Sequence, residues 1–344
     1  MITKRKLMSL AASAAMAAGM GTSAMAQEVT LKMHQFLPAQ ANVPKLVLEP
    51  WAERVEEASG GKIKIDHYPS MQLGGKPPEL YGQVTDGVAD ITWTVLGYTP
   101  GRFPQSEVFE LPFIMTNAED TSRAYWQYAE ANMMDKDFKD VKVLAVWVHG
   151  PGLIHSKEPI RSVSDLNGVK LRAPTRVANK LFTALGATPI GMPVPAVPEA
   201  LSKGVIGAAV IPWEVTGALK VPELVNNHTE FGDESLYTTA FVFAMNKEKY
   251  ESLPDDLKAA IDSQSGEDFS ALAGKLMAGA DAPSRAVAVE RGNNIITLSA
   301  DEVQEWKDAA AGIEAEWIAE MDELGFDGQA LVDQAKALIA ENTK

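Results

Sequence analysis

Residues 164–174 read Ser-Asp-Leu-Asn-Gly-Val-Lys-Leu-Arg-Ala-Pro, and within this stretch Val169–Arg172 is a short β-like run that ends directly before Ala173-Pro174. Similar runs recur along the chain, with helical patterns between them. They lie at Val29–His34, Lys62–His67, Ala89–Thr94, Val141–Val148, Val205–Ile211, Ala240–Asn246 and Asn294–Leu298. Strands that alternate with helices are typical of α/β architecture, so we expect an α/β fold with largely parallel sheets.

Helix signals lie between these runs. Apolar residues 46, 50, 51 and 55 follow one helix face until Gly60-Gly61. Capping boxes at Thr116–Glu119 and Ser299–Glu302 predict two helix starts. Beyond the second box, apolar residues from Val303 to Leu324 are spaced three and four apart, which predicts one long amphipathic helix. A stretch from Ser252 to Ala282, before Pro283, predicts a helix roughly 40 Å long at about 1.5 Å per residue.

The composition limits the classes of protein to which this chain can belong. The 344 residues are 46% hydrophobic and 22% charged, which is the balance of a globular protein of about two domains. Lys and Arg number 31 against 46 Asp and Glu, a net charge of −15 at pH 7. An acidic chain without a basic run repels phosphate backbones, so we expect no nucleic-acid partner. The chain contains no cysteine, which excludes disulfides, thiolate zinc sites and cysteine nucleophiles.

The N-terminus carries an export signal. Basic residues 4–6 precede an apolar stretch from Leu7 to Met20, and Ala24-Met25-Ala26 is a site of the kind that signal peptidase accepts. This pattern predicts a Sec-type signal peptide cleaved after Ala26, with an uncleaved signal anchor as the alternative. No later stretch is apolar enough to span a membrane, so we expect no direct membrane insertion. In a bacterium the mature chain would reside in the periplasm.

Motifs of catalysis do not occur. The sequence contains no GxSxG, HExxH or Walker A motif, and its five histidines lack HxxxH or HxH spacing. We therefore expect a protein that is not an enzyme and that binds no metal or cofactor. An exported hydrolase stays open as an alternative, because two catalytic carboxylates can come together from distant positions.

Further motifs accompany the stretch at 164–174 in a fixed order. They are Gly87–Trp93, Leu96–Pro104, Glu110–Phe113, Leu185–Pro193 and Glu199–Gly204. In this order and spacing they resemble the solute-binding proteins of tripartite ATP-independent periplasmic (TRAP) transporters, the DctP-like family. The likeness runs from about residue 28 to residue 300.

The resemblance implies a two-lobed periplasmic solute-binding protein fold with a long helix bracing both lobes. Such proteins close on a small organic carboxylate and deliver it to a TRAP permease in the membrane. By analogy, lobe I comprises residues 28–149 plus 238–276. Lobe II comprises residues 150–237 plus 277–344 and includes the C-terminal helices.

Arg172 is the residue that the resemblance places on the ligand carboxylate. It ends the run Val169–Arg172, and the matching arginine in the family clamps the ligand. A guanidinium is a rigid planar fork that holds a carboxylate through two parallel charge-assisted hydrogen bonds. The alternative is an exposed arginine in an ion pair between the lobes.

The other expected ligand-binding positions come mainly from alignment with the family. From lobe I and its crossing strand we expect His34, Gln35, Thr94, Val95, Tyr98 and Phe241; from lobe II we expect Gly152, Pro174, Met192, Ile211, Trp213 and Tyr237. For His34 and Trp213 a purely structural role stays open, and Tyr98 could serve packing alone.

Departures from the family pattern narrow the range of expected ligands. Gly152 falls where many relatives carry a second arginine, and the wholly apolar run before Pro212 replaces a DGQE-type sequence. Val95 likewise replaces an acidic or polar residue. A second buried carboxylate would lack a partner, so succinate, malate and fumarate are disfavoured. We expect a monocarboxylate with an aromatic or apolar body, such as a benzoate, mandelate or aryl-pyruvate.

Several alternatives stay open at this stage. The run Val205–Ile211 could be a buried strand without a role in binding. The ligand could be a C4-dicarboxylate or a small hydroxy- or keto-acid. The protein could also be an exported sensor that presents its ligand to a histidine kinase.

Overall fold

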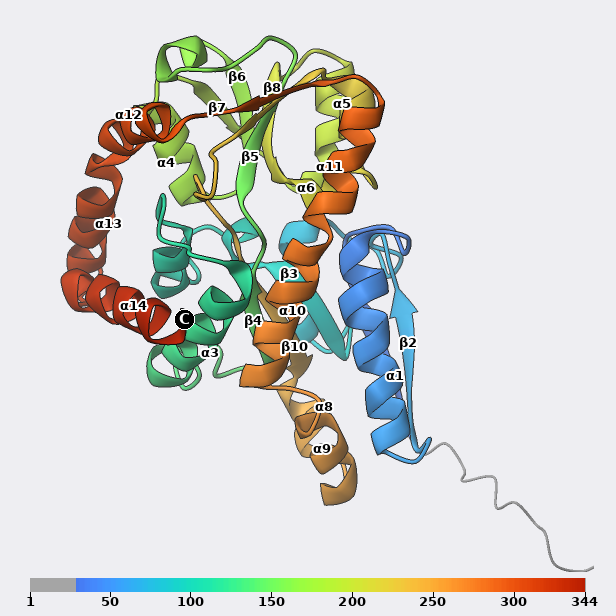
Figure 1. Cartoon of the computed structure of the whole chain (residues 1–344). Helices are drawn as coiled ribbons and strands as arrows, with labels where there is room; N and C mark the ends of the chain where they lie inside the picture. Colours follow the sequence, from blue (N-terminus) through green and yellow to red (C-terminus); the bar gives the residue numbers. More distant parts are fainter. Residues whose placement is uncertain (1–28, 344) are drawn as a thin grey trace, which may run out of the picture.

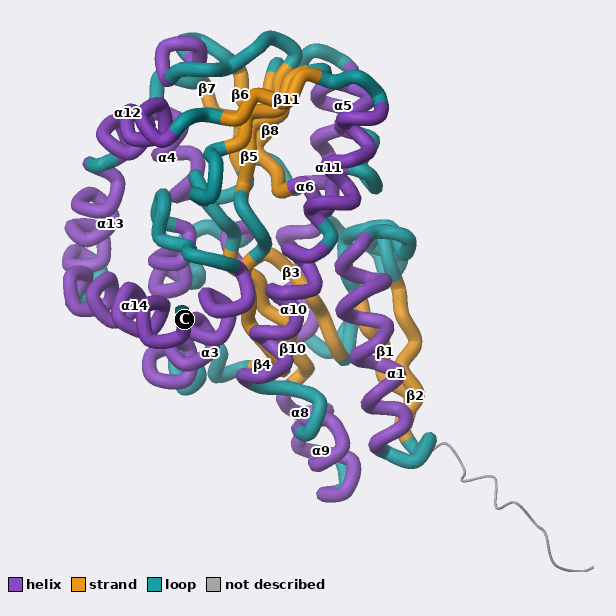
Figure 2. Tube along the Cα trace, viewed as in Figure 1, coloured by secondary structure: helices purple, strands orange, loops and turns teal. Residues whose placement is uncertain are grey.

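Two β-sheets, one above the other, organise the computed structural model, which describes residues 29–343 (Figures 1 and 2). The expected signal peptide lies outside these residues. The lower sheet has the order β2 (Ile63–Tyr68), β1 (Val29–His34), β3 (Ile91–Val95), β10 (Ala240–Asn246) and β4 (Val141–Val148). The upper sheet has the order β11 (Asn294–Thr297), β9 (Asn227–Glu230), β5 (Gly152–Ser156), β8 (Ala208–Pro212), β6 (Lys170–Ala173) and β7 (Thr188–Gly191). Each sheet is covered by helices, so the α/β class is confirmed.

The sheets are largely parallel, as expected, with one antiparallel strand in each. β1 pairs in parallel with β2 and β3, but β10 runs antiparallel to both β3 and β4. In the upper sheet, β5 is antiparallel to β8 and β9, whereas β6 is parallel to β7 and β8. The antiparallel strands β5 and β10 are those that directly follow a passage of the chain from one lobe to the other. A strand that enters its sheet from the other lobe starts at the edge facing that lobe, where the parallel strands end.

The helices of the lower lobe flank its sheet. They are α1 (Glu49–Ala58), preceded by the π-helical turn η1 (Pro44–Leu48), α2 (Leu80–Thr85), α3 (Ala118–Asn132), α8 (Lys247–Glu251), α9 (Asp255–Asp262) and α10 (Glu267–Gly279). The upper lobe has α4 (Arg176–Ala184), α5 (Val197–Ser202), α6 (Trp213–Thr216), α7 (Val221–Leu224), α11 (Asp281–Glu290) and α12 (Ala300–Ala310). Short 3-10 helices lie at η2 (Pro77–Glu79), η3 (Leu96–Tyr98), η4 (Pro104–Glu110), η5 (Val163–Leu166) and η6 (Val194–Ala196).

The helix that braces both lobes is built differently from the expected one. The stretch from Ser252 to Ala282 is interrupted before α10, where Gly266 has a φ of +96°. α10 then continues through Ala280 into α11, which passes Pro283 and ends at Glu290, so the two helices together run from the lower to the upper lobe (Figure 1). Pro283 does not end the helix because it lies in the first turn of α11, where its missing N–H group would have no partner within that helix.

The C-terminal helices also depart from prediction. The expected single helix from Val303 to Leu324 is two helices, α12 and α13 (Gly312–Glu323), that meet at Ala311-Gly312. A glycine is the weakest helix former apart from proline, so the bend falls there. The capping box at Ser299 is confirmed, whereas at α3 the cap is Asn117, whose side chain accepts from the Asp120 N–H at 2.9 Å.

The last helix returns to the lower lobe. α14 (Gly328–Asn342) packs against α3, and the arc of α12, α13 and α14 joins the two lobes on the side away from α10 (Figure 1). By its contacts α14 therefore belongs with lobe I, not with lobe II as expected. No helix within residues 29–343 is long and apolar enough to cross a membrane.

The packing of α10 on α3 generates a prediction about stability. A β-carbon at Gly274 would overlap the Ala118 carbonyl oxygen and the Ser122 hydroxyl, whereas one at Gly279 would meet nothing within 4 Å. We expect Gly274→Ala to lower the free energy of unfolding by about 1–3 kcal/mol, because backbone atoms must move apart. Gly279→Ala, the matched control, should be neutral or raise it by up to about 1 kcal/mol. Urea unfolding of both variants measures the difference, and equal stabilities would contradict this packing.

Candidate ligand-binding site

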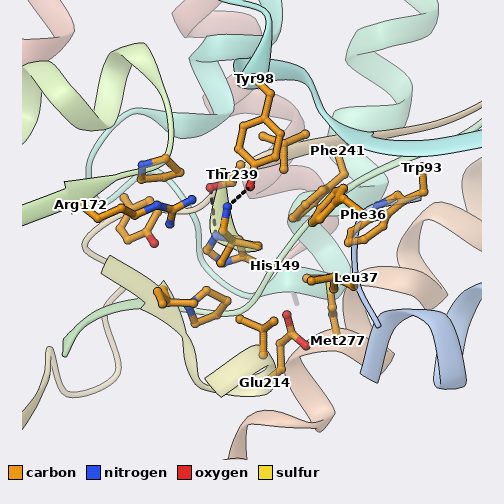
Figure 3. A pocket seen from close by; sticks show the side chains of 17 residues that line it. Phe36, Leu37, Trp93, Tyr98, His149, Arg172, Glu214, Thr239, Phe241 and Met277 are labelled. Atoms are coloured by element: carbon orange, nitrogen blue, oxygen red, sulfur yellow. Dashed lines mark hydrogen bonds between the residues drawn. The ribbon is translucent and has the colours of Figure 1, made fainter. Parts of the chain in front are cut away.

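A cavity with an empty volume of about 380 Å³ lies between the two sheets (Figure 3). The carboxyl ends of β1, β3, β6 and β8 face it, which is where open α/β sheets place their ligands. Its lining residues are Phe36, Leu37, Trp93, Val95, Tyr98, His149, Arg172, Pro174, Val194, Ile211, Pro212, Glu214, Val215, Tyr237, Thr239, Phe241 and Met277. Both lobes therefore contribute to one mostly apolar site.

Arg172 is the cation of this cavity, and it is buried with only 2% of its surface exposed. Its Nε donates to the Met192 carbonyl and its Nη1 to the Val210 carbonyl, both at 2.9 Å. No carboxylate among residues 29–343 forms an ion pair with it within 4.0 Å, which excludes the alternative of an exposed interlobe pair there. Two carbonyls orient the guanidinium but do not neutralise it, and a buried charge without a counterion is costly.

Two tyrosines stand beside Arg172. The Tyr98 hydroxyl accepts a hydrogen bond from the Val194 N–H at 2.9 Å and so links the lobes. Burial raises the pKa of Tyr98 and of Tyr237, with Arg172 opposing the shift in both, so both phenols are neutral. The ring of Tyr237 occupies the space that a β-carbon at Gly152 would need. Any side chain at position 152 would therefore collide with this ring.

His149 adds a neutral polar group. Burial lowers the pKa of His149 to about 4, with its contact to the Gly150 carbonyl opposing the shift, so the ring is uncharged at neutral pH. Nδ1 faces that carbonyl and must carry the proton. Nε2 then accepts from the Thr239 hydroxyl at 3.1 Å. This hydrogen bond thus gives both His149 and Thr239 a partner within the protein.

Stacked aromatic rings form the opposite end of the cavity (Figure 3). Trp93 stacks on Phe36 with ring centroids 4.7 Å apart and on Phe241 with centroids 5.1 Å apart. Both pairs are close to parallel, with interplanar angles of 19° and 26°. The cavity therefore combines one charged end with one flat apolar end, an arrangement suited to a planar ring that carries an acid group.

Two further carboxyl groups lie in or beside the cavity. Glu214 lines it, is 2% exposed, and has a pKa that burial and the nearby Asp281 raise well above the ordinary value. Glu110 is 2% exposed and accepts from the Ala240 N–H at 3.0 Å. Burial raises the pKa of Glu110 to about 8, although its bonds to Thr175 and Ala240 oppose the shift. Burial therefore favours the protonated form of both carboxyl groups.

The structure brings together seven of the predicted ligand-binding residues. Those that line the cavity are Val95, Tyr98, Arg172, Pro174, Ile211, Tyr237 and Phe241. They come from both sheets, as the resemblance implies.

Six predicted positions do not line the cavity: His34, Gln35, Thr94, Gly152, Met192 and Trp213. The His34 ring is held by Gln83 at 2.8 Å, and Gln35 binds the main chain of Leu37. Thr94 falls between Trp93 and Val95, so strand alternation turns it to the other face of β3. Met192 contributes only its carbonyl, which holds Arg172.

Trp213 is a structural residue. Its indole ring packs against His155 and His228, and its Nε1 donates to Glu230 at 2.9 Å. The residue next to it, Glu214, faces the cavity instead. The sequence predicted Trp213 in the lining, but the next residue, Glu214, lines the cavity because the chain turns into helix α6 directly after Pro212.

Ten lining residues were not predicted: Phe36, Leu37, Trp93, His149, Val194, Pro212, Glu214, Val215, Thr239 and Met277. Strand alternation with Val95 could have indicated Trp93, and the position of His149 directly after a strand was a usable signal. Met277 lies on α10, and nothing in the local sequence indicates that this helix reaches the cavity. In the part of the chain from 29 to 343, no three His, Asp or Glu side chains gather as metal ligands.

Comparison with known proteins gives a family match over most of the chain. The sequence profile described as "Bacterial extracellular solute-binding protein, family 7", DctP, matches residues 34–320.

Solved structures are similar over nearly the whole chain. A TRAP solute-binding protein from Rhodoferax ferrireducens T118, in complex with copurified benzoate, is 49% identical with a TM-score of 0.90, covering 91% of this chain and 98% of its own. A marine metagenome TRAP protein specific for aromatic acids, with 3-hydroxybenzoate, is 51% identical with a TM-score of 0.90, covering 93% and 100%. A TRAP protein from Bordetella bronchiseptica with bound mandelate is 26% identical with a TM-score of 0.84, covering 92% and 100%.

The raised pKa of Glu110 predicts a loss of stability as the pH increases from about 5 to 8. The folded protein holds this proton up to about pH 8, whereas the unfolded chain releases it near the ordinary value of 4.5. Over this interval the folded state binds more protons, so the free energy of unfolding falls as the pH rises. Each pKa unit is worth about 1.4 kcal/mol, so this group contributes a change of about 2–5 kcal/mol.

Glu110→Gln keeps the shape and removes the titrating proton, so it isolates this effect. We expect the stability of the wild type relative to Glu110→Gln to fall by that amount between pH 5 and pH 8 in urea unfolding. The charged neighbours Glu107 and Arg176, like the other ionisable groups, are shared by both proteins, so their contributions cancel in the comparison. Parallel pH profiles for the two proteins would show that Glu110 is ionised in the folded state.

Proposed function

Since the chain belongs to the DctP family of bacterial extracellular solute-binding proteins, family 7, we propose that it is the receptor of a TRAP transporter for an aromatic monocarboxylate. The proposed ligand binds between the lobes with its carboxylate on Arg172 and its ring against Phe36, Trp93 and Phe241. The family is a class of binding proteins, and we propose that the ligand leaves unchanged.

The observation that supports this proposal most strongly is the buried guanidinium without a carboxylate partner. Arg172 uses Nε and Nη1 on carbonyl groups, and a guanidinium has five N–H donors in all. A ligand carboxylate would meet donors that neither these carbonyls nor the neighbouring Tyr98 takes up, and would neutralise the charge in one step. Such charge-assisted hydrogen bonds are about twice as strong as neutral ones.

The rest of the lining favours one carboxylate and a ring. Tyr237 fills the space beside Gly152, so no second arginine stands there, and Val95 and Ile211 leave the walls apolar. A second ligand carboxylate would be buried without a cation, at a cost of several kcal/mol. A ring that stacks on the aromatic end gains about 0.5–1.5 kcal/mol beyond the burial of its area.

The similar proteins support the same ligand class. Those at 49% and 51% identity hold benzoate and 3-hydroxybenzoate, and the one at 26% identity holds mandelate. Each is an aromatic acid with one carboxylate. We propose a ligand of this kind for the present chain.

We place the receptor in the periplasm, after cleavage of its signal peptide behind Ala26, with the membrane subunits of a TRAP permease as its partner. We divide the chain into lobe I, residues 28–149 plus 238–276, and lobe II, residues 150–237 plus 277–344, apart from α14. A role as a sensor for a histidine kinase would use the same cavity, and the identity of neighbouring genes distinguishes the two.

Closure of the lobes around the ligand is part of the proposal. Tyr98 to Val194 and Asn42 to Glu214 are hydrogen bonds between the lobes, and Glu107 forms an ion pair with Arg176 across the same gap. A ligand that touches both lobes adds contacts that exist only when they are together, and so shifts the population toward the closed form.

Substitution of Arg172 tests the proposal. We expect Arg172→Met to weaken benzoate binding by at least about 100-fold, roughly 3 kcal/mol, because the carboxylate would be buried without a cation. Arg172→Lys should recover only part of the loss, since an ammonium group lacks the planar fork. Isothermal titration calorimetry with benzoate measures all three proteins.

Arg161→Met is the matched control, because Arg161 is exposed in the upper lobe. It should keep the wild-type affinity within about threefold, a change under 1 kcal/mol. Thermal unfolding of each variant confirms that it is folded. If Arg172→Met also stays within threefold of the wild type, the assignment of the carboxylate site is wrong.

A further inference from the structure

Glu214 is a buried acid that the proposed binding mode leaves unused. It lies in the four-residue helix α6 directly after β8, is 2% exposed, and lines the cavity close to Leu37 and Met277 (Figure 3). Its Oε2 has no hydrogen-bond partner among residues 29–343. A buried polar atom without a partner is costly, and among the described residues that line the cavity Glu214 is the carboxyl group that carries one.

The main chain holds Glu214 firmly in place. Its N–H donates to Asp281 Oδ1 at 2.8 Å, and its carbonyl accepts from Ser284 Oγ at 3.2 Å and from Asn42 Nδ2. These contacts come from α11 and from the lower lobe. These bonds hold the main chain of Glu214 from both lobes, whereas Oε2 of its carboxyl group stays unpaired.

Glu214 lies apart from Arg172, on the side of the cavity formed by Leu37 and Met277 (Figure 3). Burial and the nearby Asp281 raise its pKa. Burial also raises the pKa of Asp281 to about 7. A carboxyl that keeps its proton both donates and accepts hydrogen bonds, and it does not repel an anionic ligand.

Most other polar groups of the lining already have partners or stand at Arg172, and Trp93 Nε1, at the aromatic end, is a further buried atom without one among residues 29–343. His149 and Thr239 bond to each other, and the Tyr98 hydroxyl accepts from Val194. Beside Glu214 stand the apolar side chains of Leu37 and Met277 (Figure 3). A polar group on the ligand body, away from its carboxylate, would find a partner at Glu214.

Building on the proposed function, we propose that Glu214 determines specificity by forming a hydrogen bond with a hydroxyl group on the ring of the bound acid. The receptor then prefers a hydroxylated aromatic acid to one in which the same position carries an apolar group. A methyl group of similar size would fill the space and leave Oε2 unpaired. Sites built to bond a ligand hydroxyl reject analogues without it for this reason.

Ligand pairs test this in the wild-type protein without any substitution. Calorimetry compares 3-hydroxybenzoate with 3-methylbenzoate and 4-hydroxybenzoate with 4-methylbenzoate. At one of these ring positions we expect the hydroxyl acid to bind at least about tenfold more tightly. Affinities within about threefold at both positions would overturn the proposal.

Two variants assign the preference to Glu214. Glu214→Leu should reduce the hydroxyl-to-methyl ratio of affinities to near one while benzoate still binds. Glu214→Gln keeps a donor and an acceptor in the same shape and should retain most of the ratio. If Glu214→Leu keeps the wild-type ratio of hydroxyl-acid to methyl-acid affinity, the proposal is overturned even though the aromatic acids bind.

The outcome separates this inference from the proposed function. If benzoate and its derivatives bind and only the dependence on Glu214 fails, the receptor function stands and the specificity role falls. If none of these acids binds the wild type, both fall together.

Discussion

A buried positive charge without a carboxylate partner is the constraint on which the site depends. Arg172 lies at the end of a strand of the upper sheet, is 2% exposed, and is oriented by the carbonyls of Met192 and Val210. Folding has to offset the cost of burying this cation, and two carbonyl dipoles do so only in part. In the proposed binding mode the ligand carboxylate supplies the missing negative charge, which couples binding directly to electrostatics.

The fold places the other half of the site opposite that charge. β4 passes into β5 and β9 is followed by β10, so the chain crosses twice between the lobes, and α10 with α11 spans them as well (Figure 1). Because these connections run beside the cavity, residues of β10 and α10 line it together with residues of both sheets. Phe241 and Met277 thus enter the site from the segments that join the lobes.

The sequence predicted local features well where a single rule controls them. β1, β4 and β10 have the predicted bounds, and the cap at Ser299 is present, because strand runs and capping boxes depend on neighbouring residues alone. The antiparallel direction of β5 and β10 could not be predicted, since it depends on the lobe from which the chain returns. The helix ends at Gly266 and Gly312 were missed because apolar spacing continues across both glycines.

In the site, Arg172 and Phe241 line the cavity as expected, whereas His34 and Trp213 bond to protein neighbours. Which of two adjacent side chains faces a cavity is set by tertiary packing, as Trp213 and Glu214 illustrate.

In the proposed binding mode the negative charge of the ligand is the decisive property, and one pair of compounds isolates it. Benzoate and benzamide have the same ring and nearly the same size, but only benzoate can neutralise Arg172. Isothermal titration of the wild-type protein with both compounds measures the difference. We predict that benzoate binds at least about 100-fold more tightly than benzamide, a difference of roughly 3 kcal/mol. Equal affinities for the two compounds, or tighter binding of benzamide, would contradict the role of the buried guanidinium.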